Sequence, residues 1–210
     1  YDQNDFEMIC NEVTDSNCLA IRVDDSRYSD WDSFSAYWKQ AGSLITSASG
    51  LGITSDDATA DMLVANDLGV DVDIIASGGS GDNVTFLLNG TTDFLMGNVS
   101  EMVAAHNDGQ FKILCVFAEE RDSNLPDVPT YEELTGNLVV GCSSRGYAML
   151  KDVPDDIKQI LGDAVKAAVQ DPDLIEQLNA IYTTTDYKEG QEYVDYMNQQ
   201  QQQARETWGV

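Results

Sequence analysis

The apolar residues of this chain form short runs that alternate with amphipathic stretches. The runs rich in β-branched and aliphatic residues predict strands at 44–48, 70–76, 92–96 and 111–118. The stretches between them predict helices at 55–68, 82–88 and 99–106. Strands and helices that alternate at this spacing indicate an α/β fold, with a mostly parallel sheet and helices on both of its faces.

The two ends of the chain follow other patterns. Upstream, we predict strands at 6–10 and 18–23 and a helix that begins with a capping box near residues 29–32. That helix places Trp31, Phe34, Trp38 and Ala41 on one face. Downstream, we predict a strand at 138–142 and a polar turn at 143–147, and then helices at 154–169, 172–182 and 187–208.

The segment from Leu44 to Asp57 joins a predicted buried strand to a predicted helix through a glycine-bearing turn. The first N–H groups of a helix lack partners within it and carry a partial positive charge, so such a turn can take a carboxylate or a phosphate. The candidate ligand-binding positions are Ser49, Gly50, Gly52, Thr54 and Ser55. The alternative is an ordinary strand-to-helix turn that Thr54 or Ser55 caps.

Two further polar turns follow predicted strands. One carries the candidate residues Gly78, Gly79 and Ser80, and the other begins at Gly97 and contains the candidate Asn98. Because the carboxyl ends of parallel strands meet at one edge of a sheet, we expect the three turns to open side by side. The sequence therefore predicts a ligand-binding edge.

Composition and charge narrow the classes of partner. The chain has 210 residues, 42% of them hydrophobic, and a formal net charge of −26. This hydrophobic content supports a packed core. The negative charge argues against nucleic acid and against anionic membrane surfaces as partners. It also repels an anionic ligand at long range, so an anion site must depend on local hydrogen-bond donors.

The four cysteines suggest no redox or zinc chemistry, because the Cys-x-x-Cys spacing is absent from the sequence. Cys10 and Cys18 bracket the polar segment between the first two predicted strands, which makes a hairpin disulfide one alternative. Cys115 and Cys142 lie in strand patterns and are expected to be buried thiols.

Catalytic and metal chemistry has little support in the sequence. The Gly78–Asp82 segment resembles a nucleophile elbow but lacks its last glycine, and the single histidine, His106, fits a helix end better than a general base. A calcium site at Asp56, Asp57 and Asp61 is less favoured than a solvated helix start. We therefore expect no catalytic residue, metal or cofactor. Arg145 is the best candidate for a charge-assisted carboxylate contact, against an ordinary structural ion pair.

Several motifs occur in an order and spacing that a known family shares. The most specific is Arg121…Leu125-Pro-Asp-Val-Pro-Thr130…Glu133, and others are Gly78-Gly79, Leu88-Asn-Gly-Thr-Thr-Asp93 and Asp152-Val-Pro154. Together they resemble the substrate-binding proteins of tripartite tricarboxylate transporters, the Bug or TctC family. The resemblance runs from about Tyr1 to Trp208.

This resemblance implies a two-lobed fold of the type II periplasmic-binding-protein kind, which closes on a small carboxylate and presents it to a membrane permease. It implies a periplasmic or extracellular location, with which a lipid anchor is compatible, and no enzymatic activity. By position, the ligand turn would be Ser49 to Ser55 with Gly78, Gly79 and Asn98 beside it, and Arg145 would lie near the hinge.

The sequence also departs from the family pattern. Ile53 stands where the family commonly has Gly, and Asp57 stands where it commonly has His. An Asp near the turn disfavours a second anion. These departures keep two alternatives open, which are a sensory or regulatory ligand-binding module on the same fold and a degenerate fragment without tight binding.

The family's first lobe begins with a segment that has no counterpart here, so the chain is expected to lack the N-terminal part of lobe 1. Residues 14–142 would then form a continuous ligand-binding lobe 2, and residues 1–13 and 143–210 would belong to an incomplete lobe 1. The apolar helix positions left without their usual cover would favour a homodimer. They are Ile157, Ile160, Leu161, Val165, Tyr193, Tyr196 and Met197.

Overall fold

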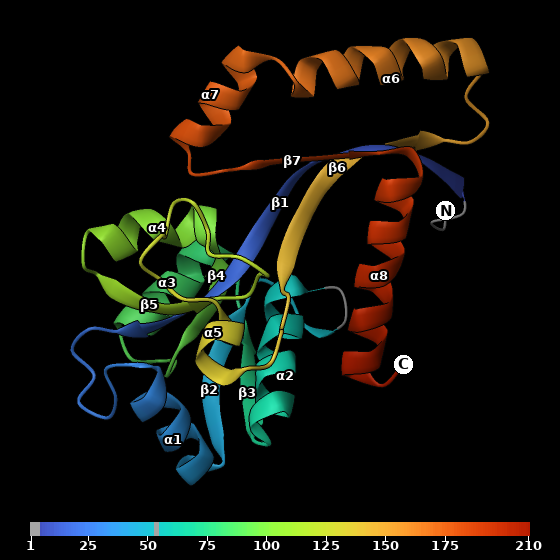
Figure 1. Ribbon diagram of the computed structural model, residues 1–210. Helices are drawn as coiled ribbons and strands as arrows, with labels where there is room; N and C mark the ends of the chain where they lie inside the picture. The colour runs from blue at the N-terminus through green and yellow to red at the C-terminus, as the bar shows by residue number, and fades with distance from the viewer. Residues whose placement is uncertain (1–4, 53–54) are drawn as a thin grey trace. The chain divides into compact units, whose positions relative to one another are not determined.

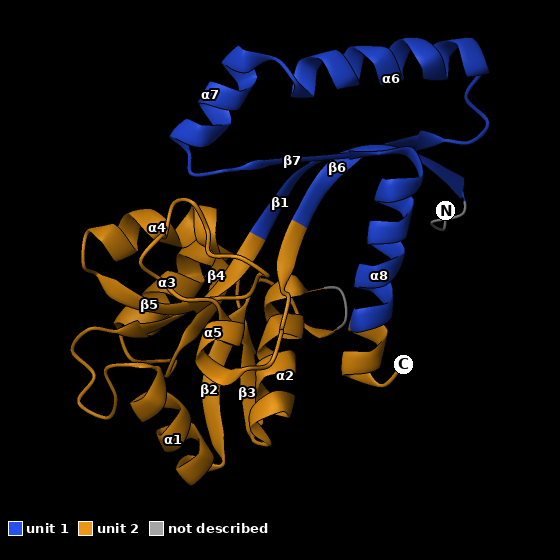
Figure 2. Ribbon diagram, in the orientation of Figure 1, with its two compact units in different colours: residues 1–15, 144–203 blue, residues 16–143, 204–210 orange. Residues whose placement is uncertain are grey.

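The computed structural model describes residues 5–52 and 55–210, which divide into two compact units (Figure 2). Unit 1 comprises residues 1–15 and 144–203, and unit 2 comprises residues 16–143 and 204–210. Strand β1 (Phe6–Arg22) begins in unit 1 and ends in unit 2. Their assignment as an incomplete lobe 1 and a ligand-binding lobe 2 stays a prediction.

Unit 2 contains strands and helices in alternation, as the hydrophobic pattern predicts (Figure 1). Its elements after β1 are α1 (Trp31–Ala41), β2 (Ser43–Ala48), α2 (Asp56–Leu68), β3 (Asp71–Ala76), α3 (Ser80–Leu88), β4 (Leu95–Asn98), α4 (Val99–Asn107), β5 (Phe111–Val116) and α5 (Tyr131–Thr135). Strands β2 and β3 pair in parallel from Ser43 opposite Asp71 to Ala48 opposite Ala76. The predicted α/β class is confirmed.

Strand β1 runs against its neighbours in unit 2. It pairs antiparallel with β4, where Asn17 lies opposite Asn98, and antiparallel with β5, where Cys18 lies opposite Val116. Strands β4 and β5 therefore point the same way, with β1 reversed between them. This arrangement brings the carboxyl end of β4 to the middle of β1, where polar side chains such as Asn17 are buried.

Aromatic side chains fill the core on one side of this sheet. Trp31, Phe34 and Trp38 are buried on one face of α1, as their spacing predicts, and the ring of Trp38 packs 4.8 Å from that of Phe94. The helix begins after Asp30, whose side chain accepts a hydrogen bond from Ser33 N at 2.9 Å. A capped start and an aromatic face together fix α1 against the sheet.

Unit 1 is built from the first part of β1 and the C-terminal elements. These are β6 (Cys142–Leu150), α6 (Asp155–Val169), α7 (Pro172–Ala180), β7 (Thr185–Glu189) and α8 (Gly190–Trp208), whose last residues belong to unit 2. Strands β6 and β7 both pair with β1, and Cys10 lies opposite Glu189 in the antiparallel β1–β7 pair. A Cβ on Gly146 would lie 2.4 Å from Cys10 O, so β6 and β1 approach closely.

The prediction of two strands around a turn at the start of the chain is wrong, because residues 6–22 form one strand. In the described part of the chain, the disulfide that the sequence left open is not formed, and Cys10 and Cys18 are buried thiols. The polar segment between them is strand because its polar groups find partners there, as Asn11 Nδ2 does with Asp186 O at 2.8 Å. Strand β7, which also begins in a polar segment, was not predicted.

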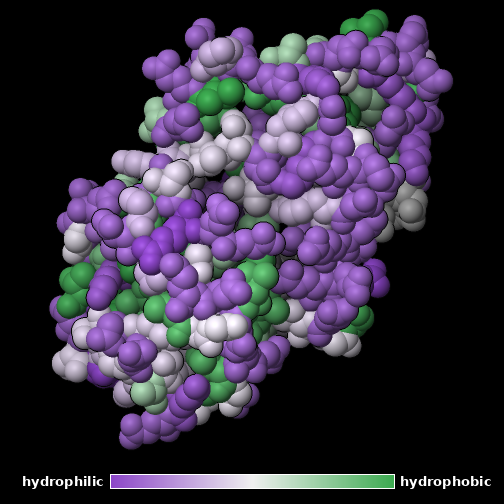
Figure 3. All heavy atoms as spheres, in the orientation of Figure 1, coloured by the Kyte–Doolittle hydropathy of each residue, from purple (hydrophilic) through white to green (hydrophobic). Residues whose placement is uncertain are grey.

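The surface matches the acidic composition. The face visible in Figure 3 is mostly hydrophilic. Within the described residues, no helix combines the length and the apolar character needed to cross a membrane.

Replacing Phe34 with Ala should lower the free energy of unfolding by about 3–5 kcal/mol, because the substitution empties a fully buried site in the aromatic cluster. Urea denaturation of the variant measures this loss. Val23→Ala is the control, since Val23 is 60% exposed. Equal losses in the two variants would contradict this account of the core.

Helix α6 leaves apolar residues exposed, which bears on the predicted homodimer. Ile157, Ile160 and Leu161 are 44%, 67% and 46% exposed, whereas Tyr193 on α8 is buried, contrary to prediction. We expect association that Ile160→Glu weakens and Val23→Glu leaves unchanged, because apolar patches of this kind drive self-association. Light scattering measures it, and a wild-type monomer that binds no hydrophobic dye would contradict it.

Candidate functional site

The turn after β2 leads into a capped helix, as predicted. Ser55 is the N-cap of α2, and its Oγ accepts a hydrogen bond from Ala58 N at 3.2 Å. Gly52 has a φ of +76°, and its carbonyl accepts from Ser55 N at 3.0 Å. The left-handed backbone at Gly52 explains why a glycine suits this turn. Thr54, the other predicted cap and donor, lies outside the described residues.

The three predicted turns lie together in unit 2. Ser77 N donates to Ala48 O at 3.0 Å, which joins the ends of β2 and β3. Asn83 Nδ2 on α3 donates to Ser49 Oγ at 3.3 Å. The end of β4 joins them through a small cavity of about 10 Å³, which is lined by residues from all three helix starts, including Asp57, Ser80, Asn83, Gly97 and Glu101. A cavity of this size holds about one water molecule.

The donors of the first turn are already engaged by Asp57 on α2. The backbone N–H and the hydroxyl of Ser49 act on the Asp57 carboxylate and lower its pKa. Asn17 Nδ2 on β1 donates to Asp57 Oδ1 at 3.3 Å. The chain therefore places one of its own carboxylates where the turn was predicted to hold a ligand carboxylate.

The second turn shows the same arrangement in a more exposed setting. Gly78 N donates to Asp82 Oδ2 at 3.0 Å, and a Cβ at Gly78 would lie 2.7 Å from that oxygen. Gly79, with a φ of +145°, precedes the first residue of α3. Gly78 thus permits a close contact within the turn, whereas Gly79 supplies a backbone conformation that favours glycine. Any ligand at this turn would compete with Asp82.

Burial changes the protonation of the α2 carboxyls. Burial, and then the charge of Asp56, raise the pKa of Asp57 to about 7, although the hydrogen bonds from Ser49 oppose the shift. One turn further along α2, complete burial raises the pKa of Asp61 well above its usual range, and the charge of Asp57 adds to the shift.

Several buried polar atoms near this edge have no hydrogen-bond partner among the described residues. They are Asn17 Oδ1, Ser47 Oγ, Asn83 Oδ1 and both carboxyl oxygens of Asp61. Unsatisfied buried polar groups are uncommon in native proteins and each calls for an explanation. Their gathering at the strand ends marks this edge as the chemically unusual part of unit 2.

Sequence reasoning did not identify Asn17 or Asn83 as part of the site. Asn17 fell in a segment taken for a surface turn, and Asn83 in the first turn of an ordinary helix. A buried strand that carries an Asn opposite another Asn was the available signal, because isolated amides are rarely buried without a polar partner.

Arg145 does not belong to the unit that contains the other candidate residues. It sits within β6, not after a strand end as predicted, and belongs to unit 1. Its half-exposed guanidinium lies 3.4 Å from the buried carboxylate of Asp15. This is the structural ion pair that the sequence left open, and a role for Arg145 in ligand binding stays a prediction.

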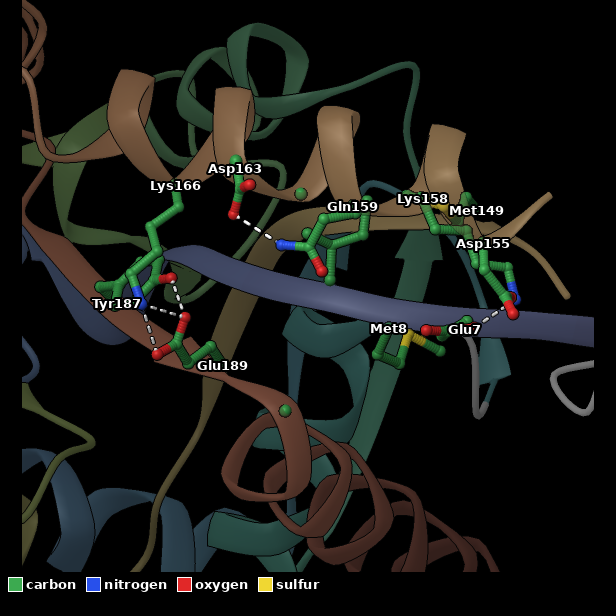
Figure 4. A pocket seen from close by; sticks show the side chains of 13 residues that line it. Glu7, Met8, Met149, Asp155, Lys158, Gln159, Asp163, Lys166, Tyr187 and Glu189 are labelled. Atoms are coloured by element: carbon green, nitrogen blue, oxygen red, sulfur yellow. Dashed lines mark hydrogen bonds and ion pairs between the residues drawn. The ribbon is translucent and has the colours of Figure 1, made fainter. Parts of the chain in front are cut away.

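Unit 1 contains a larger cavity, of about 680 Å³, between α6 and the strands (Figure 4). Its cations are paired within the chain. Lys158 Nζ lies 2.7 Å from Glu7, and Lys166 Nζ lies 2.7 Å from Glu189, which also accepts from Tyr187. Since each lysine is matched by a carboxylate, this cavity has no evident preference for an anion.

Metal and general-base chemistry find little in the structure to support them. Across residues 5–52 and 55–210, no cluster of His, Cys, Asp and Glu is arranged to hold a metal ion. His106 Nδ1 accepts a hydrogen bond from Ile113 N at 3.2 Å, so the histidine ties the end of α4 to β5.

The α/β architecture of this chain, with helices beside its sheets, matches that of solved periplasmic solute-binding proteins. The solute-binding protein TctC from Polaromonas, solved without ligand, superposes with a TM-score of 0.80 at 25% identity, and the match covers 99% of this chain and 70% of that one. MatC from Rhodopseudomonas palustris, solved with bound malate, gives a TM-score of 0.77 at 23% identity, over 97% and 68% of the two chains.

Residues 1–207 match the tripartite tricarboxylate transporter family receptor. The chain belongs to this family. A curated relative from Agrobacterium vitis, described as a UPF0065 protein in the TAR-I ttuE-ttuC' intergenic region, is 28% identical over 147 residues. That match covers 69% of this chain and 41% of the relative's length.

The stability of the protein should depend on pH through Asp57. Its pKa of about 7 in the folded state exceeds the value of about 3.9 in an unfolded chain, so the folded state holds this proton more tightly. The stabilisation is complete below about pH 4 and is lost as the pH rises through 7. From pH 5 to 8 the wild type should lose on the order of 2–3 kcal/mol relative to Asp57→Asn, by chemical denaturation. Parallel pH profiles would contradict this.

Proposed function

We propose that this protein is an extracytoplasmic solute receptor that captures a small organic carboxylate for a tripartite tricarboxylate-type transporter. The observation that carries the proposal is the convergence of three strand-ending turns around Asp57 and Asn83 in unit 2. Membership of the receptor family supports the same role. The bound malate in MatC supports a carboxylate as the class of ligand.

The proposed contacts use donors at the start of α2 and its neighbouring turns. The turn of Ser49, Gly50 and Gly52, of which Ser49 is exposed and the glycines are half-buried, would offer backbone N–H groups and a hydroxyl. Ser55 Oγ accepts from Ala58 N, and its hydroxyl hydrogen can still donate to an anion. Gly78, Gly79, Ser80 and Asn98 would border the rest of the ligand.

In this proposal the protein works by capture and presentation. The ligand binds to the turns, the binding lobes close on it, and a membrane permease accepts it from the closed receptor. The location would be the periplasm or another extracytoplasmic compartment. No chemical step on the ligand is part of this role.

One observation favours the alternative of a protein that binds no carboxylate tightly. Asp57 and Asp82 already engage turn donors that a ligand carboxylate would use. A direct binding screen distinguishes a carboxylate receptor from a protein that binds no carboxylate tightly.

We expect a library of small dicarboxylates, with malate as the first member, to raise the midpoint of thermal unfolding. A ligand at 100 times its Kd stabilises the fold by about 2.7 kcal/mol. Ser49→Ala should weaken binding by about 10- to 100-fold, because a hydrogen bond to a charged group contributes about 1.5–3 kcal/mol. Ser123→Ala, in an exposed loop, is the matched control. No shift with any carboxylate would overturn the proposed function.

A further inference from the structure

The first turn of the candidate site is held closed by a carboxylate of the chain itself. Asp57 is only 7% exposed and receives a hydrogen bond from Asn17 Nδ2 at 3.3 Å, and the N–H and hydroxyl of Ser49 lower its pKa. Ser49 itself is exposed. An anion that binds at Ser49 would therefore compete with Asp57 for the same donors.

The charged groups around Asp57 are acidic. Asp56 and Asp61 flank it on α2, and Glu101 acts on it from α4. Next to Asp57, β1, the β2 turn and α3 contribute the uncharged Asn17, Ser49 and Asn83. Helix α3 also carries the acidic Asp82, which holds Gly78 N in the second turn. A second carboxylate at Ser49 would thus meet an existing negative charge without a neutralising cation in this set. Two carboxylates that share one site cannot both stay ionised at low cost.

We propose that a ligand carboxylate binds at Ser49 together with one proton, which is taken up by Asp57. This inference rests on the proposed function and names the condition under which the site accepts an anion. Asp57 then acts as a specificity-determining residue, because it admits a carboxylate only as its own charge is removed.

The site has a place for the hydrogen bond of the added proton. Protonated Asp57 becomes a donor and needs an acceptor. Asn83 is only 2% exposed and lines the same cavity as Asp57. Its Oδ1 atom has no hydrogen-bond partner among the described residues. That cavity is too small for a ligand, but it has room for about one water molecule that could bridge the two groups.

Burial prepares Asp57 for this role near neutral pH. Because its pKa already lies at about 7, little additional free energy is needed to protonate it when an anion arrives. Below pH 7 the site is mostly protonated and affinity should be constant. Above pH 7 affinity should fall by up to ten-fold for each pH unit.

The test measures the Kd of malate by isothermal titration calorimetry on the full chain at pH 6 and pH 8, in buffers with different enthalpies of ionisation. The wild type should bind about ten-fold more weakly at pH 8 than at pH 6 and take up close to one proton at pH 8. Asp57→Asn, which keeps the size of the side chain without its charge, should bind equally at both pH values with no proton uptake.

Asp82→Asn is the matched control, because it removes the carboxylate that holds Gly78 N in the second turn. This variant should keep the ten-fold dependence on pH. Thermal melts of each variant without ligand establish that it is folded.

The outcomes separate the inference from the proposed function. Wild-type binding with equal Kd at both pH values and no proton uptake overturns the inference and leaves the function standing. Binding by Asp57→Asn without any binding by the wild type at pH 6 also overturns the inference, because most of the wild-type Asp57 is already protonated at that pH. If neither the wild type nor Asp57→Asn binds malate or any other carboxylate of the library at pH 6, the proposed function fails and the inference fails with it.

Discussion

Strand β1 is the element on which both units depend, because it is the hydrogen-bonding partner of β4 and β5 in unit 2 and of β6 and β7 in unit 1. A strand that is paired on both sides buries its polar residues as well as its apolar ones. Here that includes Asn11 and Asn17, whose Nδ2 groups donate hydrogen bonds to distant parts of the chain. These polar residues fix the register of the pairing, since a shift by one residue would leave them unpaired.

The candidate site follows from this register. Asn17 lies opposite Asn98 at the end of β4 and reaches Asp57 at the start of α2. The parallel β2–β3 pair brings a second turn to the same edge. Helix N-termini at such an edge favour negative charge, and this chain supplies part of that charge from Asp57 and Asp82. The fold of the family is thus combined with acidic side chains, Asp57 and Asp82, beside the turns of the candidate site.

Local patterns predicted most of the fold and the meeting of the three turns in unit 2. The Ser55 cap, the aromatic face of α1 and the glycine turns depend on neighbours within a few residues, and such signals are visible in a single sequence. The continuity of β1 and the existence of β7 were missed because their polar residues are satisfied by partners more than a hundred residues away, such as Asn11 with Asp186. Asn17 was not recognised because its partner Asp57, 40 residues further along the chain, cannot be identified from local patterns.

The sequence predicted only part of the behaviour of Asp57. Its unusual position next to the turn could be noted from the motif, and so could the repulsion of a second anion. The two donors from Ser49 and the nearly complete burial depend on how α2 packs against β2 and β4, which spacing alone does not determine. The protonation of Asp57 could not be predicted from the sequence, because burial in the folded structure causes most of its pKa shift.

Asp61 lies one helical turn beyond Asp57, fully buried and with neither carboxyl oxygen bonded within the described chain. A leucine of similar size would remove that desolvation cost and fill the same space, so selection for stability alone would favour it. An acid retained in the core at such a cost is a sign of selection for something other than stability. Replacing Asp61 with an apolar residue should therefore stabilise unit 2 against heat. Any property that the protein loses in that variant would reveal the role of the buried acid.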